Sequence, residues 1–141
     1  MTEDIKTRFR RIVDEAWNKG NLDALEELHN PEYTEHHAPF PDVTEMETFK
    51  QMVADTRATY PDFHITIHDL VLEGDRLASR WTWQGTHLGK TRMLNIPPTG
   101  RKVTVHGSHI LKIRDGKLSE GWQFADDIGL LRQLGVIPET K

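Results

Sequence analysis

The sequence predicts an α+β fold in one domain that spans residues 1–141. Segments with helical periodicity come first, and segments that alternate apolar and polar residues follow them. This segregated order predicts helices on one face of a curved, mainly antiparallel sheet, and it argues against a parallel sheet of alternating strands and helices. Such an arrangement is cone-shaped, with a natural pocket between the helices and the sheet. No linker rich in glycine, serine or proline divides the chain.

Two helices are expected at the start of the chain. Apolar residues three and four positions apart form one stripe over residues 5–17, and Gly20 is expected to end that helix. A short second helix is expected over residues 22–28, where three leucines share one side. It must end before Pro31, because the residue before a proline disfavours the helical conformation.

A third helix is expected after an irregular stretch. Residues 33–43, which hold two histidines and two prolines, are expected to be irregular. Thr44 and Glu47 have the spacing of a capping box, in which each side chain bonds the backbone N–H of the other residue. The helix that they begin is expected to continue to about Thr59.

The second half of the chain is expected to form an antiparallel meander and a short helix. Gly74-Asp75 and Asp115-Gly116 are hairpin turns, and counting from the first turn places Asp69 opposite Arg80. A C-terminal helix is expected to end near Gly135. The strands are expected at residues 63–68, 77–86, 103–113 and 118–124, and the last helix at about 128–134.

Composition excludes several classes of function. The net charge is −4 and the pI is about 6.0, which argues against a nucleic-acid partner, because nucleic-acid binding needs a basic patch. The chain has no cysteine, so disulfides, thiolate metal sites and a cysteine nucleophile are excluded. No apolar run approaches the ~20 residues of a membrane span, and the N-terminal segment lacks an apolar signal-peptide core. A cytoplasmic protein without a membrane partner is expected.

Short motifs follow one another in order along nearly the whole chain. They are Asn18–Leu25, Tyr60–Phe63, Glu73–Asp75, Gly85–His87, Ile96–Arg101, Asp115–Leu118, Trp122, Asp126 and Gly129–Gly135. Together they resemble the SnoaL-like polyketide cyclases, also described as predicted ester cyclases, in the nuclear transport factor 2-like and ketosteroid isomerase-like superfamily. The resemblance implies a cone-shaped α+β barrel and a homodimer that pairs through the outer face of the sheet.

The resemblance also implies an activity. The favoured reaction is an intramolecular aldol cyclisation next to a carbonyl group, with a proton-shift isomerisation next, and neither needs a metal or an organic cofactor. The ligand is then a small hydrophobic or aromatic carbonyl compound. A non-catalytic binding domain and a hydrolase such as an epoxide hydrolase stay open as alternatives. Because one fold hosts many activities, the ionisable residues that face the pocket must distinguish between these alternatives.

Asp126 is the candidate acid and base. It follows Trp122 and Phe124 on the last strand, in phase with the residues expected to face the pocket, and the resemblance implies that an aspartate at this kind of position moves protons during ring closure. Partial burial would raise the pKa of its carboxyl and make it a better base. The alternative is that Asp126 caps the C-terminal helix, a position that aspartate favours. Asp127 is expected to be the cap instead.

His109 is the candidate partner of Asp126. It lies among apolar residues of its strand, and counting back from the second turn places it opposite Trp122 on the same face. The same count places Asp126 opposite Val105, about 13 Å along the strand from His109, so a bulge, sheet curvature or a ligand would have to close the gap. The resemblance implies a pocket histidine on this strand. His106 is the alternative, although its phase points outward.

Four further residues are expected to touch the ligand. His36 is expected at the mouth of the cone, in reach of a substrate oxygen, unless it is an exposed loop histidine. Trp81 and Trp83 share one strand face and Trp122 stands on another strand, so the three form either an aromatic pocket wall or a plain aromatic core. No metal site is expected, because histidines close in sequence lie too far apart along a strand or on opposite faces of it.

Overall fold

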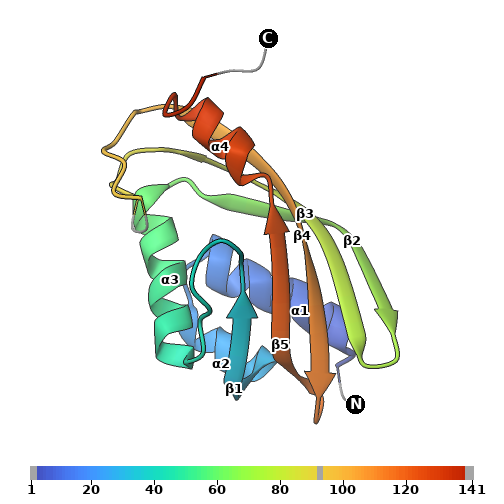
Figure 1. The fold of residues 1–141 in the computed structure, drawn as a ribbon. Helices are drawn as coiled ribbons and strands as arrows, with labels where there is room; N and C mark the ends of the chain where they lie inside the picture. The colour runs from blue at the N-terminus through green and yellow to red at the C-terminus, as the bar shows by residue number, and fades with distance from the viewer. Residues whose placement is uncertain (1–2, 92–93, 139–141) are drawn as a thin grey trace.

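The computed structural model describes residues 3–91 and 94–138. The helices lie on one face of a single, strongly curved sheet, and the other face is bare (Figure 1). No helix in the described part of the chain is long and apolar enough to cross a membrane. The elements are α1 (Ile5–Val13), the π-helical turn η1 (Asp14–Asn18), the 3₁₀ turn η2 (Leu22–Ala24), α2 (Leu25–Leu28), β1 (His29–His36), α3 (Met46–Thr59), β2 (His64–Glu73), β3 (Arg76–Thr86), β4 (Lys102–Arg114), β5 (Lys117–Ala125) and α4 (Asp127–Gln133).

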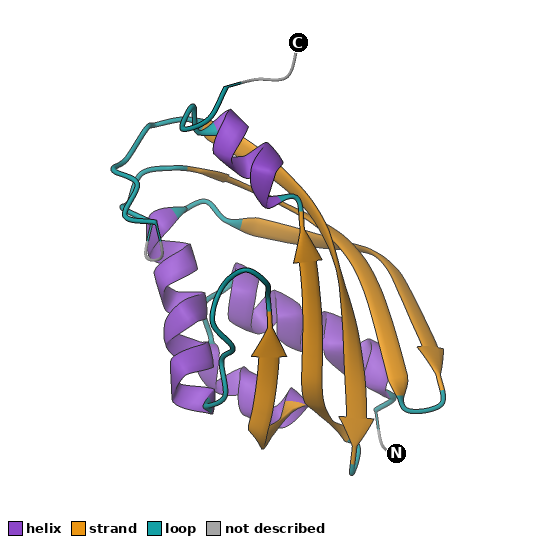
Figure 2. Cartoon of the chain, viewed as in Figure 1, coloured by secondary structure: helices purple, strands orange, loops and turns teal. Residues whose placement is uncertain are grey.

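The predicted cone-shaped α+β fold is confirmed, although the sheet does not close into a barrel. The strand order is β1-β5-β4-β3-β2, and all neighbours are antiparallel except β1, which runs parallel to β5. Figure 2 shows the strands bending around the helices, with α3 and α1 on the concave side. Four strands and their two hairpins lie where the sequence predicts them. The predicted pair of Arg80 and Asp69 also forms, with a distance of 2.6 Å between Nε and Oδ2.

Strand β1 was not predicted. Its residues are polar apart from Pro31 and Tyr33, and in this strand only His29, Tyr33 and Glu35 are buried. The segment is extended because its backbone pairs with the edge of β5, a contact between residues far apart in the sequence. This non-local pairing places Glu35 on the concave side of the sheet. The irregular stretch expected for these residues would have given the Glu35 side chain no defined position.

A one-residue bulge in β5 changes which side chains face inward. The pairing of β4 and β5 starts at the turn as predicted, but Ser119 is an extra residue, and every later partner is moved by one position. Because side chains alternate between the faces of a strand, a shift by one exchanges the two faces. His109 therefore pairs with Gln123, and Trp122 pairs with Ile110, so the predicted pair of His109 and Trp122 is wrong.

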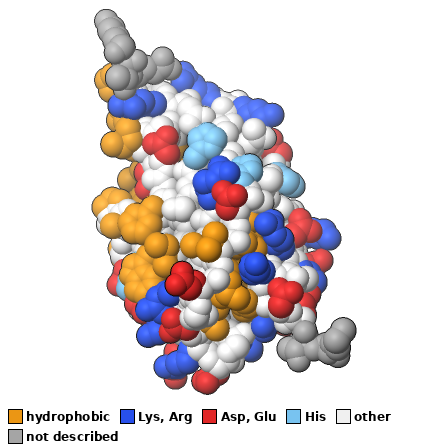
Figure 3. Space-filling model, turned by 90° about the vertical axis from the view of Figure 1, so that its right-hand side faces the viewer, with side chains coloured by type: hydrophobic (Ala, Val, Ile, Leu, Met, Phe, Trp, Pro, Cys, Tyr) orange, Lys and Arg blue, Asp and Glu red, His pale blue; other side chains and the backbone are white. Residues whose placement is uncertain are grey.

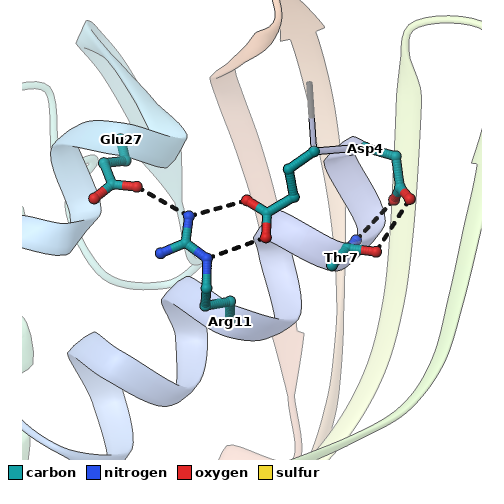
Figure 4. A network of polar contacts seen from close by, with 5 residues as sticks. Asp4, Thr7, Arg11 and Glu27 are labelled. Atoms are coloured by element: carbon teal, nitrogen blue, oxygen red, sulfur yellow. Dashed lines mark hydrogen bonds and ion pairs between the residues drawn. The ribbon is translucent and has the colours of Figure 1, made fainter. Parts of the chain in front are cut away.

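Local interactions define the ends of the first helix. The Asp4 carboxylate accepts hydrogen bonds from the Thr7 backbone N–H at 2.8 Å and from its hydroxyl at 3.1 Å, which satisfies a free donor at the start of α1 (Figure 4). One turn later, the Arg11 guanidinium bonds Glu3 and Glu27 at 3.0 Å each, and so connects α1 to α2. Gly20 has φ +84° and ends the helical segment, as expected.

The third helix begins without the predicted capping box. Helix α3 starts at Met46 after an extended Glu45, and no side chain caps it. The preceding residues instead pair with β1, where the backbones of Glu35 and Val43 exchange hydrogen bonds of 2.8 and 3.0 Å. This bridge holds the loop between β1 and α3 against the sheet, and it sets the loop geometry in place of the capping box.

Candidate functional site

A cavity of about 450 Å³ lies between the helices and the concave face of the sheet. Its wall is mostly apolar and rich in aromatic rings, which suits a flat, largely hydrophobic ligand. The structure places Trp81 and Trp83 in this wall, with Trp81 buried and Trp83 half-buried. The aromatic residues that line the cavity are Phe9, Trp17, Tyr33, Phe40, Phe49, Tyr60, Phe63, Trp81 and Trp83.

A buried polar cluster lies at one end of the cavity. The Nε2 atom of His109 is 2.8 Å from Oε1 of Glu35, and the Tyr33 hydroxyl donates to the same oxygen at 2.6 Å. Only 3% of the Glu35 side chain and 16% of the His109 side chain are exposed. The cluster is thus a carboxylate–imidazole pair almost withdrawn from solvent, within an apolar cavity.

Gly121 allows this cluster to form. Glu35 on β1 and His109 on β4 are separated by β5, and Gly121 is the β5 residue that pairs with Glu35. A Cβ atom at this glycine would lie 2.7 Å from Oε1 of Glu35 and would also clash with the Tyr33 hydroxyl oxygen. Since Gly121 has no side chain, the Glu35 carboxylate can cross over β5 and reach the imidazole on the next strand.

The hydrogen bonds and charges of the cluster determine its protonation. Burial alone raises the pKa of Glu35, but the positive charge that His109 carries when it is protonated, the hydrogen bond of His109 and the bond from Tyr33 outweigh it and bring the pKa below its ordinary value. The carboxylate is therefore ionised and accepts both bonds, which puts a proton on Nε2 of His109. In a neutral imidazole with that proton, Nδ1 carries a lone pair and is the basic atom.

A second histidine–carboxylate pair lines a more open part of the cavity. Nε2 of His37 lies 3.0 Å from Oδ2 of Asp127, and their side chains are 22% and 30% exposed. Leu94, which is 52% exposed, also belongs to the lining. These partly exposed residues mark the mouth of the cavity, whereas the cluster around Glu35 is buried.

Asp126 and Asp127 exchange the positions that the sequence predicted. The Asp126 carboxylate accepts a hydrogen bond of 2.8 Å from the Gly129 backbone N–H and caps α4, whereas Asp127 lines the cavity. Asp126 is exposed and is not part of the cavity wall. The cause is the bulge at Ser119, which turns Asp126 out of the phase expected for it. The helix cap, which was the alternative interpretation of Asp126, is thus the one the structure shows.

Two substitutions test the capping contact of Asp126. Asp126→Ala is expected to lower the free energy of unfolding by about 1 kcal/mol, whereas Asp126→Asn, which can still accept the bond, should change it little. Urea denaturation of the two variants measures the difference. Turnover should be unchanged in Asp126→Asn, and a loss of turnover in that variant would show that this carboxylate has a role beyond the cap.

His36 and Trp122 lie outside the cavity. The imidazole of His36 stacks on Trp122, with ring centroids 5.5 Å apart, and it bonds Glu120 through Nε2 at 2.7 Å and Asp42 through Nδ1 at 2.9 Å. The hydrogen bonds to Glu120 and Asp42 raise the pKa of His36 above its ordinary value. Neither residue lines the cavity, so the expected contact of His36 and Trp122 with a ligand is not supported by their positions.

Three residues with carboxyl or amide side chains, on β1, β5 and α4, line the cavity but had no place in the expected site. Glu35, Gln123 and Asp127 all face inward, and each was missed because its position depends on strand β1 or on the bulge. In the sequence, the one sign that Glu35 faces inward is its position two residues after Tyr33, which puts both on the same face of a strand. Among the described residues, no group of three or more histidine, aspartate and glutamate side chains is placed to hold a metal ion.

The chain is similar to known proteins over most of its length. A family model of SnoaL-like polyketide cyclases matches residues 7–134. The chain is 31% identical to the nogalonic acid methyl ester cyclase of Streptomyces nogalater over 131 residues, which are 85% of this chain and 90% of the relative. It is 29% identical to the aklanonic acid methyl ester cyclase of Streptomyces peucetius, over 89% of this chain and 87% of the relative.

A solved structure shows the same fold. TsrD from Streptomyces laurentii superposes with a TM-score of 0.85 at 29% sequence identity, over 97% of this chain and 99% of that chain. The similarity extends over both the helices and the sheet, and so includes every element that lines the cavity.

Proposed function

Because the chain belongs to the SnoaL-like polyketide cyclase family, we propose that it closes a carbon ring in a small carbonyl compound by an intramolecular aldol reaction. The observation that carries the proposal is the buried Glu35–His109 pair in the apolar cavity. A base of this kind next to a bound carbonyl compound can remove a proton from a carbon atom. No metal or organic cofactor is needed for that reaction.

The proposed chemistry begins with proton transfer to His109. Nδ1 takes a proton from the carbon next to a carbonyl group, and the electron pair of the C–H bond forms an enolate. The ionised Glu35 stabilises the resulting imidazolium through Nε2 and fixes its orientation, so Glu35 acts as a positioning residue. The enolate carbon then attacks a second carbonyl carbon of the same molecule, and a carbon–carbon bond forms as that carbonyl becomes an alkoxide.

The final step returns the proton. The alkoxide takes it from the imidazolium of His109, so that the product is an isomer of the substrate and the enzyme ends in its starting state. The pair of His37 and Asp127 lies at the mouth of the cavity and is a second place where a product oxygen can be protonated. The described lining includes no lysine or arginine, which favours a neutral ester over a free carboxylate.

Turnover of nogalonic acid methyl ester, the compound named for one relative, tests the function. The expected result is a product of unchanged mass with a new ring, detected by chromatography and mass spectrometry. In D₂O, deuterium should enter the carbon next to the carbonyl of the substrate that is recovered unreacted, because the enolate can take a deuteron back from His109 before the ring closes. Tight binding of this ester with neither ring closure nor deuterium exchange would contradict the proposal and would favour a binding domain.

The bare outer face of the sheet supports the proposed homodimer. Trp122 and the exposed Ile110 and Phe124 lie on this face, and Phe124 is 60% exposed. Apolar side chains gather on this side of the molecule beside a group of histidines (Figure 3). An exposed apolar patch rimmed by polar residues is typical of a protein–protein interface, and a second copy is the occupant we propose.

The cytoplasmic location of the protein stays a prediction.

Placing a charge in this patch should disrupt the dimer. Phe124→Lys is expected to convert a dimer into a monomer, because an unpaired ammonium group would have to be buried in the interface. Size-exclusion chromatography with light scattering measures the mass. Val136→Lys, at an exposed apolar residue outside the sheet, is the matched control and should stay dimeric. A monomeric wild-type protein would contradict the proposal.

A further inference from the structure

Gln123 is a cavity residue for which the proposed chemistry gives no role. It pairs with His109 across the β4–β5 ladder and lines the cavity. Directly opposite residues of neighbouring strands have Cβ atoms about 4.5–5.5 Å apart and point to the same side. The Gln123 amide therefore stands beside the imidazole that we assign as the base.

The neighbours of Gln123 leave room for a ligand. On the same face of β5, Gln123 has Gly121 on one side and Ala125, which lines the cavity, on the other; the first has no side chain and the second has a single methyl group. The long amide side chain thus projects between two small residues into open cavity space. Its position on the inner face follows from the bulge at Ser119, because without that extra residue it would face outward.

The amide of Gln123 has no hydrogen-bond partner among residues 3–91 and 94–138. The ionisable groups around it are all paired, Glu35 with His109 and Asp127 with His37. A polar group that faces an apolar cavity without a partner costs free energy, and a bound ligand that supplies a partner recovers it. Gln123 is thus the polar group of this region that remains available for the ligand.

We propose that Nε2 of Gln123 donates a hydrogen bond to the substrate carbonyl oxygen next to the carbon that His109 deprotonates. The inference rests on the proposed function and adds the group that stabilises its enolate. As the proton leaves, negative charge builds on this oxygen, and an N–H donor in a largely apolar cavity stabilises it. A neutral amide suits this task, because it cannot take the proton and does not compete with His109 as a base.

The experiment compares Gln123→Met and Gln123→Glu with the wild type, using nogalonic acid methyl ester as the probe. Gln123→Met keeps the length of the side chain and removes the donor, so kcat should fall by about 10²–10³-fold, the usual effect of losing one oxyanion donor. The dissociation constant, measured by quenching of tryptophan fluorescence, should change far less. Gln84→Met, on the exposed outer face of β3, is the matched control and should keep full turnover.

A pH profile separates a hydrogen-bond role from a packing role. In Gln123→Glu the ionised carboxylate repels the enolate, but the protonated form can donate, so turnover relative to the wild type should rise as the pH falls. A merely structural residue would give a constant ratio. If both variants keep kcat within about threefold of the wild type, the role of Gln123 is overturned while the cyclase function stands.

A binding measurement keeps the inference testable if the wild type does not convert the probe. That result would contradict the proposed function, and the carbonyl stretching frequency of bound, ¹³C-labelled ester would then test Gln123 alone. A hydrogen bond lowers this frequency, so the wild type should show a lower value than Gln123→Met. Equal frequencies in the two proteins, or no binding of the ester to either, would overturn the inference.

Discussion

Replacing Glu35 with glutamine is expected to lower kcat by about 10²–10⁴-fold. The carboxylate accepts the Nε2–H of His109 and so fixes the tautomer in which Nδ1 is the base. An amide at the same place can present its own N–H groups to the imidazole and no longer stabilises the positive charge that forms on it. The loss should appear in kcat, because Glu35 acts on the imidazole of His109 and is not assigned a bond to the substrate.

Glu120→Gln is the matched control for this substitution. Glu120 also bonds a histidine, His36, at 2.7 Å, but on the outer side of the sheet. Turnover should be unaffected by Glu120→Gln. His109→Gln should lose about as much activity as the double variant in which Glu35 and His109 are both replaced, because the effects of residues that act as a unit are not additive. Equal activity of the Glu35 and Glu120 variants would contradict the assigned base.

Acid should destabilise the protein through His29. This residue is 6% exposed, lies against the rings of Tyr33 and Phe49, and bonds the Leu25 carbonyl oxygen through Nδ1 at 2.9 Å. Burial lowers its pKa to about 4. The native state therefore keeps the imidazole neutral at a pH where the unfolded chain, with a pKa near 6.5, takes up a proton.

The sign of the effect follows from this difference. As the pH falls from about 6.5 to about 4, the unfolded state binds one more proton than the native state, and the free energy of unfolding should drop by about 3 kcal/mol. His87, whose pKa burial also lowers, acts in the same direction. His36 has the opposite sign, because its raised pKa gives stability that is present below about pH 6.5 and lost as the pH rises above it.

Urea denaturation at several pH values between about 7 and 5 measures the contribution of His29. His29→Phe keeps a ring between Tyr33 and Phe49, and the Leu25 carbonyl keeps its bond from the backbone N–H of residue 29. In this variant the slope of the free energy of unfolding against pH should be smaller, because the unfolded state no longer takes up the extra proton at residue 29. An identical pH dependence in wild type and His29→Phe would contradict the buried, neutral state of His29.

Local patterns were sufficient to predict most of the fold. The two hairpin turns and the alternation of their strands gave the order of β2 to β5, and they gave the Asp69–Arg80 pair. Strand β1 could not be predicted in this way, because it is extended by pairing with β5, which lies 86 residues later in the chain by the register of His36 with Trp122. Its own side chains carry little apolar alternation.

The candidate site was harder to predict than the fold. His109 could be selected because it stands among apolar residues of an alternating strand, and the structure places it in the cavity. Its partner Glu35 could not, because their contact depends on the missing side chain of Gly121 on the strand between them. Asp126 was favoured over Asp127 because a regular ladder puts it in phase with the pocket-facing residues and because the resemblance implies an aspartate there. The bulge at Ser119 reverses that phase.

The bulge at Ser119 also makes the site sensitive to chain length. Many side chains can occupy an outward-facing bulge, so substitution of Ser119 should be tolerated. Deletion of this residue would instead restore a regular ladder and turn the rest of β5 inside out. Trp122 and Phe124 would then fill the cavity, Gln123 would enter the outer face, and the chain would lose its ligand space without losing a single one of the residues proposed to act on the ligand.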